Sequence, residues 1–233
     1  MSMRSKVGFL SLAYVVVASA VFAGNEANPD AIELAPLPMP VEFKSDMDSP
    51  VAFDASTTVV VDCPDAKGAE WLAAHFREWY GKDAPKVVSN VAGVEMLPIP
   101  IANSQLASEA YAVRADASGV KISARTLAGV RWAAYTLRQL AIAKRGTFKT
   151  EGRILPSLAI SDAPHLKFRA VHLCWFPEVR PQQMERAIRL AALLKFNYAI
   201  IEPWGMYRSE RHPWWHWPNP TMTKSEVRRL VRI

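Results

Sequence analysis

Residues that could bind a sugar follow two predicted strands in the last third of the sequence. Trp175 follows a strand predicted at residues 168–174, and Glu202 and Trp204 follow one predicted at residues 198–201. A tryptophan ring offers a flat apolar face to a sugar and an N–H that can donate to a hydroxyl. A carboxylate such as Glu202 can accept from hydroxyls, but acid catalysis of glycoside cleavage needs a second carboxylate nearby, and the sequence offers none here. The same tryptophans would also suit packing of loops against a barrel rim, so both interpretations stay open.

The elements that must position these residues alternate between strand and helix. A helix is predicted at residues 181–195, with Pro181 in its first turn, and another at residues 225–233, with Thr223 as a possible cap. Strand, helix, strand, helix is how a (β/α)8 TIM barrel begins. Doubly wound sheets begin in the same way, but no Gly-rich phosphate loop favours them. A whole barrel needs about 250 residues, so residues 151–233 are expected to hold about two βα units of a truncated barrel.

The preceding residues predict a small α+β domain. Apolar residues alternate at Tyr111–Ala115 and at Val120–Ala124, separated by a turn containing Gly119, which is the pattern of a β-hairpin. Thr126 can then cap a helix that extends to Leu140. Further strands are predicted at residues 51–54, 57–62 and 97–102, and a helix at residues 65–80 that Gly81 can end. We therefore expect residues 36–150 to form an antiparallel sheet covered by two helices.

The amino-acid sequence of the predicted hairpin and helix resembles that of the non-catalytic N-terminal domain of glycoside hydrolase family 20, the β-N-acetylhexosaminidases. That family has the run E-x-Y-x-L, then G-V-x-I-x-A, then x-G-x-x-x-A/G-x-x-T-L-x-Q-L. The matching residues here are Glu109, Tyr111, Val113, Gly119, Val120, Ile122, Ala124, Gly129, Thr136, Leu137, Gln139 and Leu140. The family's next motif, I-x-D-x-P-x-F-x-x-R-G, is similar to Ile160-Ser161-Asp162-Ala163-Pro164 with Leu166 and Arg169-Ala170.

The resemblance implies an activity and one more binding residue. Arg169 stands where the family has an arginine that binds hydroxyls of the terminal sugar, although a buried arginine tied to a carboxylate would look the same. The family removes terminal N-acetylhexosamines by substrate-assisted retaining hydrolysis with an Asp-Glu pair. That pair is expected beyond Ile233, so the chain is expected to be an inactive fragment of the enzyme.

Two departures from the family keep other functions open. Cys174 and Pro177 stand where the first barrel strand usually has Asp and Arg, and Glu202 stands where the second usually ends in His. A non-catalytic carbohydrate-binding protein and an α-glucuronidase-like glycosidase therefore remain alternatives.

The N-terminus predicts export. Residues 1–23 have a basic start at Arg4 and Lys6, an apolar run and small residues at Val21 and Ala23, which is the pattern of a signal peptide. Residues 24–35 are predicted to form a linker. The protein is thus expected in the periplasm or outside the cell, with no membrane association after cleavage of the signal.

The charge distribution and the spacing of cysteines and histidines indicate which kinds of partner the chain can bind. The net charge is +6, but the basic residues form no patch interleaved with a nucleic-acid-binding module, so nucleic acid is not an expected partner. The two cysteines, Cys63 and Cys174, are expected to be unpaired and lack zinc-site spacing. His212 and His216 are four residues apart, but Pro213 argues against a helix that would align them on a metal. His172 is expected to pack under the helices. The sequence thus predicts no metal and no cofactor, and the expected partner is a glycan ending in N-acetylhexosamine.

Overall fold

The computed structural model describes residues 35–90, 104–143, 153–176, 178–204, 209–214 and 222–231. All of these belong to one compact unit, Leu34–Ile233. The predicted signal peptide, nearly all of the predicted linker and the predicted strand at residues 97–102 lie outside the described residues. Among the described residues, every helix is too short or too polar to cross a membrane.

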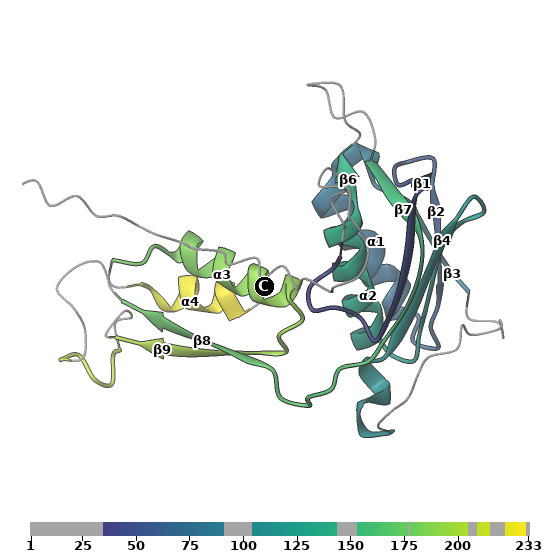
Figure 1. Ribbon diagram of the computed structural model, residues 1–233. Helices are drawn as coiled ribbons and strands as arrows, with labels where there is room; N and C mark the ends of the chain where they lie inside the picture. Colours follow the sequence, from purple (N-terminus) through teal and green to yellow (C-terminus); the bar gives the residue numbers. More distant parts are fainter. Residues whose placement is uncertain are drawn as a thin grey trace, which may run out of the picture. The chain divides into compact units, whose positions relative to one another are not determined.

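The described elements fall into a first group around a large sheet and a second group around a pair of strands (Figure 1). The first group consists of β1 (Glu42–Ala52), β2 (Thr58–Asp62), α1 (Lys67–Tyr80), η1 (Gly81–Asp83), β3 (Lys86–Ser89), η2 (Ser104–Glu109), β4 (Tyr111–Asp116), β5 (Gly119–Ala124), α2 (Leu127–Leu140), β6 (Ile142–Ala143) and β7 (Arg153–Asp162). The second consists of β8 (Ala170–Trp175), α3 (Pro181–Leu193), β9 (Tyr198–Pro203) and α4 (Lys224–Val231).

The large sheet is mixed, which corrects the predicted antiparallel sheet. Its seven strands have the order β1-β7-β4-β5-β2-β3, with β6 beside β7. β2 runs parallel to both β3 and β5, whereas β7 pairs antiparallel with β1 and β4. β7 is an inner strand of this sheet, so residues beyond the predicted boundary at residue 150 contribute to the sheet as well.

The predicted hairpin and its helix are confirmed. β4 and β5 pair from Tyr111 with Ala124 to Asp116 with Gly119, and Gly119 has a φ of 125°. α2 begins after Thr126, whose hydroxyl accepts a hydrogen bond from the N–H of Ala128 at 3.2 Å. This cap satisfies one of the N–H groups that the first helical turn leaves free.

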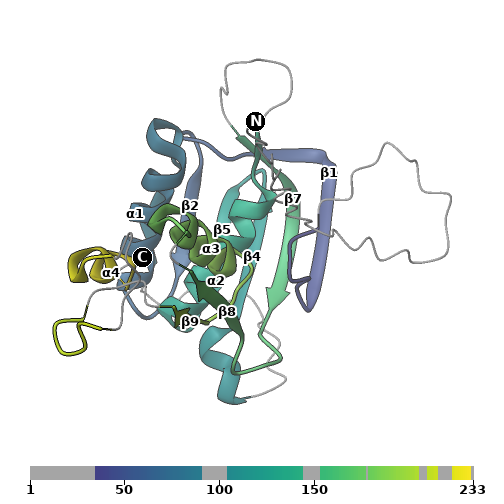
Figure 2. The same cartoon turned by 90° about the vertical axis from the view of Figure 1, so that its left-hand side faces the viewer.

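Helices α1 and α2 cover one face of the large sheet (Figure 2). The core between these helices and the sheet is apolar and fully buried, with Phe53, Leu72, Ile122 and Leu137 all at 0% exposure. The rings of Phe53 and Phe76 meet edge to face, with centroids 5.5 Å apart. Burial of this apolar area provides the main stabilisation of the domain.

The second group is a parallel pair of strands with a helical crossover. β8 and β9 pair in register from Ala170 with Tyr198 to Trp175 with Pro203. α3 has Pro181 in its first turn, and Glu226 of α4 and Thr223 before it form reciprocal capping hydrogen bonds. The described residues contain only this one parallel pair outside the large sheet, so the barrel stays a prediction.

Candidate functional site

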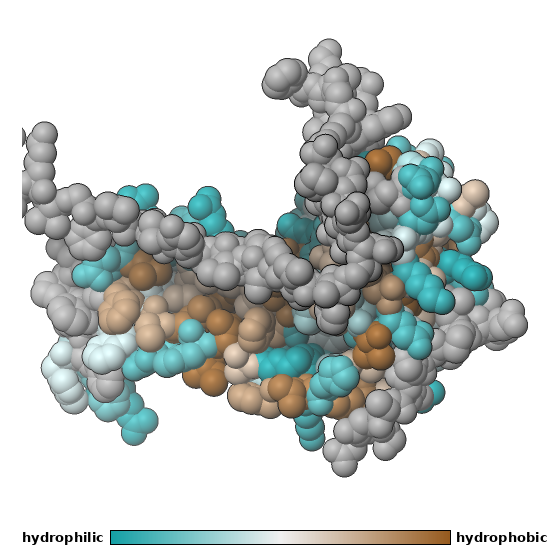
Figure 3. Space-filling view, in the orientation of Figure 1, coloured by the Kyte–Doolittle hydropathy of each residue, from teal (hydrophilic) through white to brown (hydrophobic). Residues whose placement is uncertain are grey.

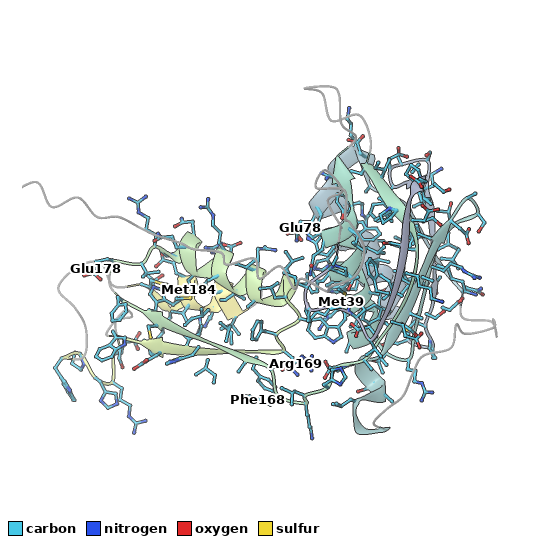
Figure 4. All side chains as sticks on the ribbon, viewed as in Figure 1. Met39, Glu78, Phe168, Arg169, Glu178 and Met184 are labelled. Carbon is cyan, nitrogen blue, oxygen red and sulfur yellow. The ribbon has the colours of Figure 1, made fainter. Side chains whose placement is uncertain are left out.

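The two faces of the β8–β9 pair have different surroundings. Trp175, Leu173 and Ile201 pack with Met184 of α3 and Leu230 of α4 in a small apolar core. Figure 4 shows Met184 between α3 and this strand pair. Because side chains alternate along a strand, His172 and Cys174 of β8 and Glu202 of β9 point to the opposite face, which we call the open face.

Trp175 lies on the covered face. Its exposed fraction is 3%, and its indole N–H donates to the carbonyl oxygen of Val179 at 3.0 Å. The side chain therefore contributes to the small apolar core and its N–H already has an acceptor. Sugar binding by Trp175 stays a prediction, and this placement gives it no support.

Trp204 forms an exposed aromatic pair with Phe176. The two rings are stacked, with centroids 5.8 Å apart and an interplanar angle of 22°. The backbone N–H of Trp204 donates to the carbonyl oxygen of Trp175 at 3.0 Å, which continues the strand pairing one residue beyond β9. With Trp204 46% exposed, the pair offers an apolar aromatic surface at the carboxyl ends of both strands.

Glu202 lies on the open face, next to two potential donors. Its Oε2 accepts from the Cys174 thiol at 3.3 Å and lies 3.1 Å from Nε2 of His172. The hydrogen bond to the Glu202 carboxylate raises the pKa of the Cys174 thiol, because the carboxylate favours the protonated form. His172 is 56% exposed, so the prediction that it packs under the helices is wrong. Because side chains alternate along β8, Leu173 faces the helices instead.

Arg169 lies just before β8 (Figure 4), whereas Glu202 of β9 pairs with Cys174 near the carboxyl end of that strand. Its guanidinium forms an ion pair with Glu109 and donates to the carbonyl oxygens of Lys195, at 2.9 Å, and Leu166, at 2.6 Å. It also lies 5.5 Å from the centre of the Trp132 ring. The structure thus places Arg169 in contacts between the two groups of elements, and its binding of sugar hydroxyls stays a prediction.

A buried polar network lies beside Arg169. The ammonium of Lys195 donates to the Tyr111 hydroxyl at 2.7 Å and to Oδ2 of Asp162 at 2.8 Å, while the Tyr111 hydroxyl meets that of Thr136 at 2.6 Å. Burial lowers the pKa of Lys195, opposed by the Asp162 carboxylate, and burial raises the pKa of Tyr111 well above its usual value. The network joins the loop after α3 to β4, β7 and α2.

Gln139 of α2 makes a second connection of this kind. Its side-chain amide donates to the carbonyl oxygens of Leu37, at 2.7 Å, and Leu193, at 2.8 Å, and accepts from the N–H of Leu37 at 2.6 Å. Several residues that this chain shares with the family motifs therefore have a structural role in this chain. Glu109, Tyr111, Gln139 and Asp162 contact the second group of elements, Arg169 before it or the segment before β1, and Thr136 contacts the Tyr111 hydroxyl.

Pro177 and His216 lie outside the described residues. Cys63 is buried and Cys174 exposed, and both are free, as expected.

Comparison with known proteins identifies one family. The model of glycosyl hydrolase family 20, domain 2, matches residues 31–163, which end one residue after β7. No curated protein sequence matches the chain.

Solved structures with a similar fold include hexosaminidases. The β-N-acetylhexosaminidase of Streptomyces coelicolor A3(2) aligns with a TM-score of 0.63 and 20% identity, over 84% of this chain and 43% of that one. The β-N-acetylhexosaminidase of Bacteroides fragilis NCTC 9343 aligns with a TM-score of 0.60 and 17% identity, over 85% and 42%. An exo-β-N-acetylglucosaminidase from Vibrio harveyi in complex with N-acetylglucosamine has a TM-score of 0.60 and 17% identity, over 91% and 37%. This chain thus spans less than half the length of each.

Proposed function

The chain belongs to glycosyl hydrolase family 20, and on that premise we propose that its protein is an exported enzyme removing terminal N-acetylhexosamines from glycans. The family match and the fold of the hexosaminidases support a carbohydrate substrate. The observation that carries the proposal is the exposed Phe176–Trp204 stack at the carboxyl ends of β8 and β9, with Glu202 two residues before Trp204 in the sequence. Substrate sites of barrel enzymes are built at this end of the strands.

The proposed reaction is substrate-assisted retaining hydrolysis. The acetamido oxygen of the substrate attacks the anomeric carbon, a glutamic acid protonates the leaving oxygen, and an aspartate orients the acetamide. Because the chain spans less than half of the matched structures, the activity is proposed for the whole protein. We expect the purified 233 residues to release no aryl N-acetylglucosaminide, since the resemblance places the Asp-Glu pair beyond Ile233. Measurable release would contradict this assignment.

Within this chain, we propose that Trp204 supplies a ring face and Glu202 a carboxylate to the sugar. Trp204 has the exposure this role needs, and Glu202 lies on the open face two residues before it. Export is proposed from the signal-like residues 1–23. The non-catalytic and α-glucuronidase-like alternatives gain no support from the comparisons, because the matched structures are hexosaminidases.

A glycan array tests the sugar site. The purified chain should retain glycans that end in N-acetylglucosamine or N-acetylgalactosamine, and Trp204→Ala should weaken retention about fivefold or more, because an aromatic contact contributes roughly 1 kcal/mol beyond its buried area. Trp214→Ala is the matched control, since Trp214 is 76% exposed and lies outside the stacked pair. Equal losses in the two variants, or no retention by the unmodified chain, would count against the proposed site.

A further inference from the structure

Three different metal-binding side chains converge on the open face of β8 and β9. Oε2 of Glu202 lies 3.1 Å from Nε2 of His172 and 3.3 Å from Sγ of Cys174. The three ligand atoms all lie within 4.8 Å of one another, and no other such group of three occurs among the described residues.

The backbone fixes this arrangement. His172 and Cys174 are two residues apart on β8, so both side chains leave the same face of the strand. Cys174 is the register partner of Glu202 on β9. The strand pairing therefore keeps the thiol and the carboxylate side by side, and the imidazole approaches from the neighbouring position.

The spacing fits a tetrahedral metal ion. With zinc bonds of about 2.3 Å to sulfur and 2.0–2.2 Å to nitrogen or oxygen, ligand atoms stand about 3.3–3.7 Å apart. The two separations that involve Glu202 are within about 0.2 Å of that range. The separation between His172 and Cys174, at most 4.8 Å, needs to close by roughly 1 Å, which rotation of two exposed side chains can supply.

We propose that His172, Cys174 and Glu202 bind a divalent transition metal ion of the zinc class. A thiolate and an imidazole favour zinc, cobalt or nickel over calcium and magnesium, which prefer oxygen ligands. On binding, the Cys174 thiol gives up its proton to solvent, and its negative charge and that of Glu202 balance the two positive charges of the ion. Three protein ligands leave a fourth position open for water or another small ligand.

This site does not require the proposed glycosidase activity. Its ligands come only from β8 and β9, and it requires no catalytic carboxylate pair. The bound ion would engage Oε2 of Glu202 and so neutralise the carboxylate that the proposed sugar site uses. The metal site does not need the sugar site in order to form, so a cobalt titration without glycan can succeed or fail whatever the outcome of a glycan array run without metal.

Cobalt titration of the purified, reduced 233-residue chain tests the proposal. A thiolate bound to Co²⁺ gives an intense charge-transfer absorption, which should saturate at one ion per chain and disappear on addition of Zn²⁺. Cys174→Ser should abolish this absorption, and His172→Ala and Glu202→Gln should each weaken zinc binding tenfold or more in calorimetry. Cys63→Ala is the matched control, because Cys63 is the other free cysteine and is buried in the large domain.

The results separate the possible outcomes. Thermal unfolding without metal should be the same for Cys174→Ser and the unmodified chain, because Cys174 is exposed, and loss of the absorption in that folded variant supports the site. Absence of the charge-transfer absorption in the unmodified chain overturns the proposal. An absorption that survives in Cys174→Ser, or that Cys63→Ala removes, overturns it as well.

Discussion

The buried pair of Lys195 and Asp162 should be essential for the attachment of the second group of elements to the large sheet. Their side chains are only 6% and 12% exposed, and the Lys195 ammonium has two partners, Asp162 at 2.8 Å and Tyr111 at 2.7 Å. Asp162→Asn keeps the size of the side chain but removes its charge. The ammonium then remains buried without a counter-charge in contact with it.

The expected loss of stability follows from the cost of an uncompensated buried charge. Removal of one partner from a buried ion pair costs about 3–5 kcal/mol, and the lower end, about 3 kcal/mol, applies because the Asn oxygen can still accept a hydrogen bond. For a unit of roughly 200 residues, each kcal/mol lowers Tm by about 2–4 °C. Asp162→Asn should therefore unfold about 6–12 °C below the unmodified chain.

Thermal unfolding followed by circular dichroism measures the effect, with Glu78→Gln as control. Glu78 pairs with Arg189 at 3.1 Å, but both side chains are well exposed, so this variant should lose less than about 1 kcal/mol. The double variant Asp162→Asn/Lys195→Met should recover part of the loss, because it also removes the buried ammonium. Equal shifts for Asp162→Asn and Glu78→Gln would refute the reasoning.

Three further predictions concern the first group of elements, around the large sheet, and each is checked by thermal or urea unfolding. Gly129→Ala should destabilise by about 1–3 kcal/mol, because its Cβ would lie 2.5 Å from the carbonyl oxygen of Ala110; a gain in stability, as helix propensity alone predicts, would contradict this. Thr126→Ala should lower the free energy of unfolding by about 1 kcal/mol through loss of the cap on the N–H of Ala128. Thr126→Ser should retain most of the stability, because its hydroxyl can accept the same hydrogen bond. The Tyr80 hydroxyl is buried with no hydrogen-bond partner among the described residues, so Tyr80→Phe should be neutral or stabilising at pH 7. Burial raises the pKa of Tyr80 to about 12, so its unfolded form ionises first and stability falls as pH rises from about 10 to about 12; Tyr80→Phe should remove roughly 2–3 kcal/mol of that fall, and an unchanged slope would argue against it.

The sequence predicted the elements whose signals are local. The hairpin around Gly119, the helix after Thr126 and the helix after Pro181 all depend on contacts between residues close in the chain. The strand β7 was missed, and its partners show why. It pairs with β1 and β4, which precede it by many residues, and pairing over such distances leaves no pattern in a short window of sequence. The parallel pairing of β2 with β3 and β5 was missed for the same reason.

The candidate site was predicted less well than the fold. The alternation of side chains along residues 170–175 contained enough information to put Trp175 and Leu173 on one face and His172 and Cys174 on the other. The meeting of His172 and Cys174 with Glu202 required the register of β8 against β9, which the sequence does not specify. A search for paired cysteines or a His-x3-His spacing cannot find such a site, because its ligands come from two strands.

The position of β7 in the sheet has a consequence for synthesis of the protein. β1 ends at Ala52, and β7, which among the described strands is the one that pairs with it, ends at Asp162. At translation rates of about 5–20 residues per second, the residues between them take roughly 6–20 s to be made. During that time β1 lacks β7 as a partner, and the backbone groups that later pair with β7 stay available to other chains. The nascent chain should therefore depend most on chaperones between synthesis of β1 and synthesis of β7, and slowing translation across this interval should increase its aggregation.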